Sequence, residues 1–334
     1  LDVCFVSLNT LKDQMAPALQ IFADVVLNPE FPQDEFERLQ KQTIARIQRE
    51  KVTPMQMALR VFPGLLYGRD HAYGAPLTGS GTEASVSAMT RRQMIDFHGT
   101  WFKPNNWRPG TVPQKNLAPV ADRPSTVYLV DRPGSQQSIL FAGHLTLPRA
   151  NAQEEEIQMM NNILGGDFTS RINMNLREDK RWSYGARSFI VDAKGQRMYI
   201  TYSSVQGDKT AEAMAEVKKE LQGIIGENPP TADEFAKTQS NTLLGLPGSW
   251  ETMGSVAGSV AEIVQYNLPD DYYQKYPDKI RNMTLANVQQ AASVVKPDHV
   301  VWVIVGDRAK IEAPIKDLGF GEIKYADADG NLLQ

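Results

Sequence analysis

One charged segment in the second half of the chain contains the side chains best suited to chemistry. It reads GGDFTSRINMNLREDKRWSYG over residues 165–185 and places Arg177 seven residues before Tyr184. An arginine supplies charge-assisted hydrogen-bond donors and a tyrosine supplies a hydroxyl group, so together they could bind an oxygen that gains negative charge. The pair also has a structural explanation. An arginine in the last turn of a helix suits the helix dipole, and a tyrosine in a strand usually packs.

The composition is that of a globular protein that needs more than one domain. The chain has 334 residues, of which 42% are hydrophobic and 22% charged. A formal net charge of −4, without a long basic run, argues against nucleic acid as a partner. The apolar run at residues 299–306 is far shorter than the roughly 20 residues of a membrane span and predicts a buried strand. The single cysteine, Cys4, excludes an intrachain disulfide and is expected in the core.

An internal repeat indicates that the chain contains two copies of one unit. Short motifs of the first part recur in the same order and at nearly constant spacing in the second part. The pairs are Asp34-Glu35-Phe36 with Asp233-Glu234-Phe235, Met89-Thr90 with Met283-Thr284, and Lys103-Pro104 with Lys296-Pro297. Residues 2–19 also parallel residues 198–214, each as a strand, a polar turn and a helix. The predicted fold class is therefore α+β, with two related units of a sheet and helices.

The first unit is expected to be incomplete. We assign it to residues 1–106 and expect further strands before Leu1 and after Asn106. Residues 107–125 are rich in proline and are predicted to be a linker. Residues 126–334 form the second unit. Its strands are expected at 126–132, 137–147 and 299–306, and its helices near 154–164 and 309–318.

Four stretches of the sequence resemble segments of a known peptidase family. NNILGGDFTSRINMNLREDKRWSYG resembles the glycine-rich turn, helix and Arg-to-Tyr segment in the second half of insulinase-like (pitrilysin) zinc metallopeptidases. This family also contains the mitochondrial processing peptidases. VVLNPEFPQDEFERLQ, LLYGRDHAYGAPLTG and MTRRQMIDFHGTWFKPNN resemble the latter part of the family's first half. The resemblance covers nearly the whole chain in order, and it implies paired α+β half-units that enclose a chamber.

The resemblance implies a role for the charged segment. Arg177 and Tyr184 would project across the chamber and hold the carbonyl oxygens of an extended peptide substrate, which could add along a sheet edge. Gly165 and Gly166 would let the turn pass close to its neighbours, so that the helix and strand aim both side chains in one direction. All four residues are candidates for substrate binding, and the Arg/Tyr pair also for catalysis.

The metal ligands of the family are not found in this chain. The family's motif is H-x-x-E-H with a further glutamate downstream, and no histidine here has a second histidine four residues away. The histidines are His71, His98, His144 and His299. Arg46 occupies the position of the downstream glutamate, and an arginine cannot ligate zinc. A slip of one helical turn would bring Glu50 to that position instead. The resemblance therefore implies that the zinc ion is held by a partner subunit and that this chain supplies no metal ligand.

Three functions follow from the resemblance. The first is the substrate-binding subunit of a heterodimeric zinc metallopeptidase, together with a zinc-carrying subunit of the same family. The second is a homodimeric zinc peptidase whose metal motif lies outside these residues. The third is a non-catalytic scaffold subunit. The chain is most similar to the bacterial two-subunit branch, which implies a periplasmic location. No membrane span is expected.

Overall fold

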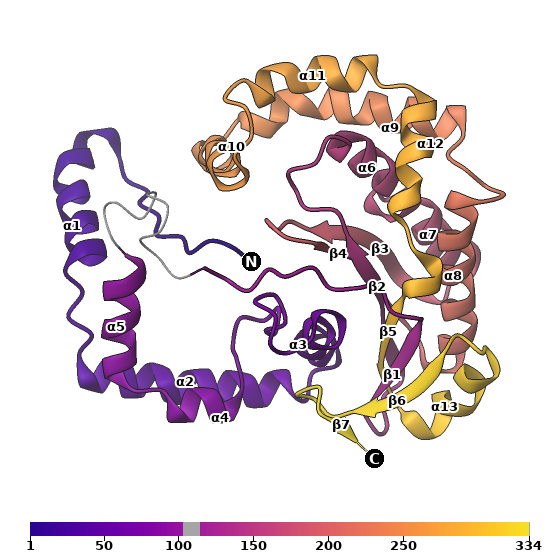
Figure 1. The fold of residues 1–334 in the computed structure, drawn as a ribbon, viewed down its shortest axis with the longest axis horizontal. Helices are drawn as coiled ribbons and strands as arrows, with labels where there is room; N and C mark the ends of the chain where they lie inside the picture. Colours follow the sequence, from indigo (N-terminus) through magenta and orange to yellow (C-terminus); the bar gives the residue numbers. More distant parts are fainter. Residues whose placement is uncertain (103–113, 334) are drawn as a thin grey trace.

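The computed structural model describes residues 1–102 and 114–333 (Figure 1). Residues 1–102 are helical, without a strand. Their elements are η1 (Lys12–Gln14), α1 (Met15–Leu27), α2 (Gln33–Glu50), α3 (Pro54–Tyr67), α4 (Glu83–Ala88) and α5 (Arg91–Trp101). The start signals are local. Proline stands in the first turn of α3, and Thr82 and Thr90 cap α4 and α5 with capping boxes.

The second part of the chain builds one seven-stranded sheet. Its order is β3-β4-β2-β5-β1-β6-β7. The strands are β1 (Thr126–Asp131), β2 (Gln137–Thr146), β3 (Ser183–Val191), β4 (Arg197–Gln206), β5 (Val301–Gly306), β6 (Glu322–Ala326) and β7 (Leu332–Leu333). β1 pairs in parallel with β5 and β6, whereas the other pairs are antiparallel. All six residues of β5 are buried, as its uninterrupted apolar sequence predicts.

Helices connect these strands and cover the sheet. They are α6 (Glu154–Asn161), η2 (Asn162–Gly166), α7 (Arg171–Asn173), η3 (Met174–Asp179), η4 (Gly207–Lys209), α8 (Thr210–Ile225), α9 (Ala232–Gly245), η5 (Leu246–Trp250), α10 (Met253–Tyr266), α11 (Tyr272–Asn282), α12 (Leu285–Ala291), η6 (Ala292–Val294), η7 (Pro297–His299) and α13 (Arg308–Asp317). None of the helices in the described part of the chain is long and apolar enough to cross a membrane. The mixed architecture confirms the predicted α+β class.

The sheet has an apolar core on each face. One core joins the strands to α6, α8 and α12 and includes the fully buried Trp302. The opposite core joins them to α3, which lies across the sheet from α8 (Figure 1) and contributes Phe62. The first part of the chain therefore supplies a layer of the second part's core, which positions the two parts relative to each other.

The helices repeat as the sequence predicts. α2 and α9 each begin at the recurring Asp-Glu-Phe motif, and α5 and α12 each follow a capping threonine, Thr90 and Thr284. The Gln40 Nε2 of α2 donates to the carbonyl oxygens of Val86 and Met89 at 2.8 and 3.1 Å. In the second part, Gln239 Nε2 of α9 donates in the same way to the carbonyl oxygens that end α11, including that of Ile280 at 2.7 Å. The same side-chain contact thus recurs at matching positions.

The start of the chain differs from the expectation. Residues 1–11 have no regular secondary structure, although a strand was expected there. A strand needs a neighbour for its backbone N–H and C=O groups, and residues 1–102 provide none. Cys4 is consequently exposed and not part of the core. Residues 114–125 of the proposed linker carry no helix or strand, while Lys103-Pro104 and Asn106 lie outside the described residues.

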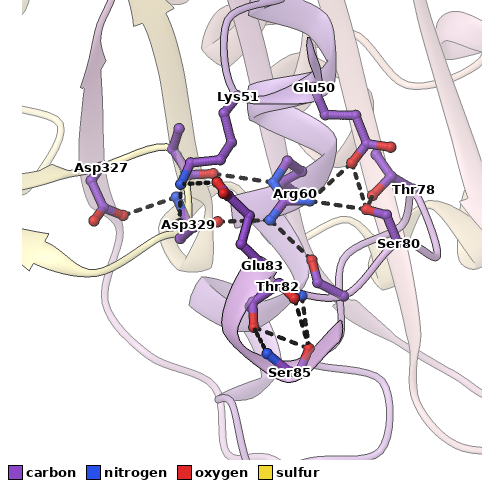
Figure 2. A network of polar contacts seen from close by, with 12 residues as sticks. Glu50, Lys51, Arg60, Thr78, Ser80, Thr82, Glu83, Ser85, Asp327 and Asp329 are labelled. Carbon is purple, nitrogen blue, oxygen red and sulfur yellow. Dashed lines mark hydrogen bonds and ion pairs between the residues drawn. The ribbon is translucent and has the colours of Figure 1, made fainter. Parts of the chain in front are cut away.

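A buried ionic network connects the first part of the chain to the C-terminal segment (Figure 2). The guanidinium of Arg60 lies 2.9 Å from Glu50 Oε2 and 2.7 Å from Asp329 Oδ1, and its side chain is 1% exposed. Lys51 Nζ lies 2.7 Å from the other Asp329 oxygen. Burial alone would raise the pKa of Glu50, but hydrogen bonds from Ser80 and Arg60 lower it overall. Glu50 is therefore ionised and paired.

Candidate functional site

The structure brings Arg177 and Tyr184 to one pocket. Both side chains line a cavity of about 470 Å³ at the end of the sheet where β2 begins and β4 ends. Tyr184 is 90% exposed, and the Arg177 side chain is 39% exposed. Neither side chain is packed into the core, so both are accessible to a ligand in this pocket.

Irregular backbone places each of the two side chains. Arg177 lies on η3, a π-helical turn, and π-turns within helices often occur at functional sites. Tyr184 lies at a β-bulge in β3, because the register with β4 shifts between Ser183 and Ala186. A bulge re-aims a side chain relative to the regular alternation of a strand. The hydroxyl of Ser183 accepts from the N–H of Gly185 at 3.0 Å and thereby holds the bulge in place.

The pocket is polar and has a positive excess. Arg177 Nε lies 3.3 Å from Glu178 Oε1, and its guanidinium lies 4.6 Å from the ring centre of Phe168. Both contacts are at the surface and can be exchanged for a ligand at little cost, since exposed ion pairs contribute about 0–1 kcal/mol. The exposed Tyr184 hydroxyl can donate to an acceptor at the same place. The arrangement can therefore bind an oxygen atom that carries partial or full negative charge.

Six further residues, which the sequence pattern did not single out, line the pocket. They are Gln137, Glu178, Arg181, Trp182, Ser183 and Gln206. Four of them belong to the charged segment, so their proximity to Arg177 could have been inferred from the chain itself. Gln137 and Gln206 are far apart in the sequence and meet as partners in the β2–β4 register. Only the strand pairing brings them together.

Gly165 and Gly166 lie outside the pocket lining and have a packing role. A Cβ atom on Gly165 would lie 2.2 Å from Ser188 Oγ and 2.7 Å from its backbone nitrogen, so the turn packs directly on β3. A Cβ on Gly166 would lie 2.6 Å from the Asn162 side chain. The expected close backbone approach is present. Its partner is the strand that carries Tyr184, and Gly165 itself is buried.

Replacement of Gly165 by alanine tests this packing role. The added methyl group has no space against Ser188, so we expect the free energy of unfolding to fall by about 1–3 kcal/mol. Gly99→Ala is the matched control, because a Cβ at Gly99 in α5 would meet no neighbouring atom and alanine favours a helix. Urea denaturation of both variants measures the difference. Equal stability of Gly165→Ala and the unchanged chain would contradict the packing role.

The edge of β3 is already occupied beside the pocket. The N–H of Ala186 donates to Asn173 Oδ1 at 3.0 Å, and Asn161 Nδ2 donates to the carbonyl oxygen of Ser188 at 3.3 Å. Both asparagines are buried. A peptide could not use these backbone groups of β3 without displacing two buried amides, so β3 does not offer a free edge at this position.

The residues expected near a metal do not fit a zinc ion. Arg46 is exposed and lies 3.7 Å from Glu50 Oε1, and Glu50 is committed to Arg60 and Ser80. Whether Arg46 or Glu50 is matched to the family's downstream glutamate, α2 therefore offers no carboxylate that is free to bind zinc. Across the described ranges 1–102 and 114–333, no group of three or more His, Cys, Asp and Glu side chains could hold a metal ion.

The four histidines have partners within the protein. His71 accepts from the N–H of Tyr73 at 3.0 Å, and His98 Nε2 lies 2.7 Å from the carbonyl oxygen of Val26. His299 Nδ1 lies 2.9 Å from a backbone carbonyl oxygen. Burial lowers the pKa of His144 to about 4, and its Nε2 accepts from a backbone N–H at 3.2 Å. These contacts give all four a structural explanation.

Comparison with known proteins finds a family match for part of the chain. Residues 104–242 match the family model described as Peptidase M16 inactive domain. Over these residues the chain is similar to the M16 peptidase family. An uncharacterized zinc protease of Mycobacterium leprae is 22% identical over 289 residues, which are 77% of this chain and 64% of that protein. The chain thus spans slightly less than two thirds of the length of this relative.

Solved structures share the fold. A peptidase M16 inactive domain from Pseudomonas fluorescens has a TM-score of 0.75 at 21% identity and covers 88% of this chain and 75% of its own. The first half of a periplasmic protease from Escherichia coli has a TM-score of 0.63 at 13% identity, covering 92% and 75%. At these identities the likeness concerns the fold. The shared fold agrees with the family model that matches residues 104–242.

Proposed function

We propose that this M16 chain is the substrate-binding subunit of a heterodimeric zinc metallopeptidase. The complex would hydrolyse extended peptides in an enclosed chamber, and this chain would contribute Arg177 and Tyr184 to the active site. The observation that supports the proposal is that both side chains line one solvent-accessible pocket. M16 relatives of this chain are called zinc proteases, which favours peptide hydrolysis as the reaction of the complex.

The zinc ion is proposed to belong to the partner subunit. The described residues of this chain do not fit zinc, because Arg46 is a cation and Glu50 is paired with Arg60. The M16 inactive-type domain agrees with such a division of roles. The proposed partner is a zinc-carrying subunit of the same family, and the hydrolytic chemistry of the metal would come from that subunit.

The proposed work of this chain is to bind and orient the peptide. The Arg177 guanidinium would donate charge-assisted hydrogen bonds to a peptide carbonyl oxygen, and the Tyr184 hydroxyl would donate a further one. These bonds strengthen as negative charge develops on that oxygen during hydrolysis. They are worth most where the partner subunit excludes water. The occupied edge of β3 favours contacts from these side chains over strand addition at that edge.

The domain organisation and location are part of the same proposal. Residues 1–106 and 126–334 would be two related units joined by the proline-rich segment 107–125. The recurring contacts of Gln40 and Gln239 support this duplication. A periplasmic location is proposed because the fold is shared with a periplasmic protease, in addition to the likeness to the bacterial two-subunit branch.

A scaffold role is the second candidate, favoured by the description of the matching domain as inactive. The two are separated by peptide turnover in the peptidase assembled from this chain and a co-expressed zinc-carrying M16 subunit. Loss of turnover with Arg177→Ala supports the substrate-binding role. Arg187→Ala is the control, because Arg187 is exposed on β3 but does not line the pocket. Unchanged turnover in both variants would leave the scaffold role.

A further inference from the structure

Arg181 has a backbone conformation that its residue type does not explain. Its φ is 58°, in the left-handed region, and in the described residues only Phe31 and Asn267 share a positive φ among non-glycine residues. Arg181 is the second residue after η3, beyond the C-cap Lys180, and helices commonly end on a left-handed glycine at this position. A side chain with a Cβ atom is strained in this conformation, so glycine would be the more stable choice here.

The turn at Arg181 is held by backbone groups and not by its guanidinium. The N–H of Trp182 donates to the carbonyl oxygen of Leu176 at 3.0 Å, which fixes the turn to the end of η3. Gln206 Nε2 donates to the carbonyl oxygen of Arg181 at 3.3 Å. Within residues 1–102 and 114–333, no hydrogen bond or ion pair of the Arg181 side chain is found, and the residue is exposed. Its side chain therefore has no structural role that offsets the strain.

The same side chain lines the pocket of Arg177 and Tyr184. Two guanidinium groups and one carboxylate, that of Glu178, face this cavity. Because the Glu178 carboxylate pairs with Arg177, no carboxylate of the pocket lining neutralises the charge of Arg181. Trp182 and Tyr184 add apolar surface, and the neutral side chains of Gln137, Ser183 and Gln206 complete the lining. The pocket thus has one more positive charge than is needed to bind a neutral peptide carbonyl group.

We propose that Arg181 selects peptides that carry a carboxylate beside the bound backbone. Its guanidinium can bind a carboxylate through two parallel N–H···O bonds, while Arg177 and Tyr184 hold the neighbouring carbonyl oxygen. The carboxylate could come from an aspartate or glutamate side chain or from the C-terminus of the peptide. This inference rests on the proposed function, because it assigns a substrate preference to the same pocket.

Three peptides of equal length test the inference with the full 334-residue chain. The first has a central glutamate and blocked ends, the second a glutamine at that position and blocked ends, and the third the glutamine and a free C-terminus. Dissociation constants are measured by calorimetry at low salt. We expect one carboxylate-bearing peptide to bind about tenfold more tightly than the blocked glutamine peptide, a difference of about 1.4 kcal/mol. Which of the two binds more tightly identifies the source of the carboxylate.

Arg181→Gly is the decisive variant. It should abolish the preference and leave the midpoint of thermal unfolding equal or higher, because glycine suits the left-handed position. Arg181→Asn should also abolish the preference, since asparagine tolerates this conformation. Arg187→Ala, on the same strand as Tyr184, should keep it.

The outcomes distinguish this inference from the proposed function. Equal affinity of the unchanged chain for all three peptides would overturn the role of Arg181, as would a preference that persists in Arg181→Gly. If Arg177→Ala still weakens binding in either case, the proposed function stands without the selectivity. If none of the three peptides binds, the inference fails, and turnover with the zinc-carrying subunit added decides the proposed function separately.

Discussion

Arg177→Ala is expected to lower peptide turnover of the proposed heterodimeric peptidase about 100-fold or more. The reason is that a charge-assisted donor to the reacting carbonyl group stabilises the transition state more than the bound substrate. The loss should therefore fall on kcat, with a smaller change in KM. Because the side chain is 39% exposed and its contacts with Glu178 and Phe168 are at the surface, folding should be little affected.

Two further variants serve as a second test and as a control. Tyr184→Phe removes only the hydroxyl group of a 90% exposed side chain and should also reduce kcat. Arg187→Ala removes an exposed arginine of β3 that does not line the pocket, and it should leave kcat unchanged. An equal decrease in kcat for all three variants would indicate a general disturbance of η3 and β3. It would argue against a specific role of the pocket.

The second large effect concerns stability. Arg60→Met should lower the free energy of unfolding by about 3–5 kcal/mol, because the buried carboxylate of Glu50 loses its buried cation and keeps the longer contact with the exposed Arg46. The Glu50 side chain is 8% exposed and Arg60 is 1% exposed, so solvent cannot replace the lost contact. The same substitution removes the contact with Asp329 and loosens the link to the C-terminal segment (Figure 2).

Urea denaturation measures this loss, with Arg92→Met as the control. Arg92 pairs with Asp96 at the surface, and its side chain is 79% exposed, so its removal should change stability by less than about 1 kcal/mol. Adding Glu50→Gln to Arg60→Met should recover part of the loss, since the uncompensated charge is removed. A result for Arg60→Met within about 1 kcal/mol of the unchanged chain would show that the network is not a major source of stability.

The sequence predicts a helix or strand well where the residues of that segment alone determine it. The apolar run at 299–306 corresponds to β5, and the repeated threonines Thr90 and Thr284 each cap a helix. The strand expected near Cys4 is absent because a strand depends on a neighbour, which residues 1–102 do not provide. Periodicity within one segment cannot report whether such a neighbour exists.

In the candidate site, too, the residues of one segment are predictable, whereas those that depend on strand pairing are not. Arg177, Arg181, Trp182 and Tyr184 are close in sequence, and one segment places them around one pocket. The contribution of Gln206 depends on its pairing with a residue on another strand, which the local pattern does not encode. The left-handed backbone of Arg181 was also not predictable, because the usual signal for that conformation is a glycine.

The zinc content and peptidase activity of the isolated 334-residue chain test the central claim most directly. The account predicts zinc far below one ion per chain and no peptide turnover until a zinc-carrying M16 subunit is added, after which turnover depends on Arg177. One zinc ion per chain, together with turnover in the absence of any partner, would contradict it.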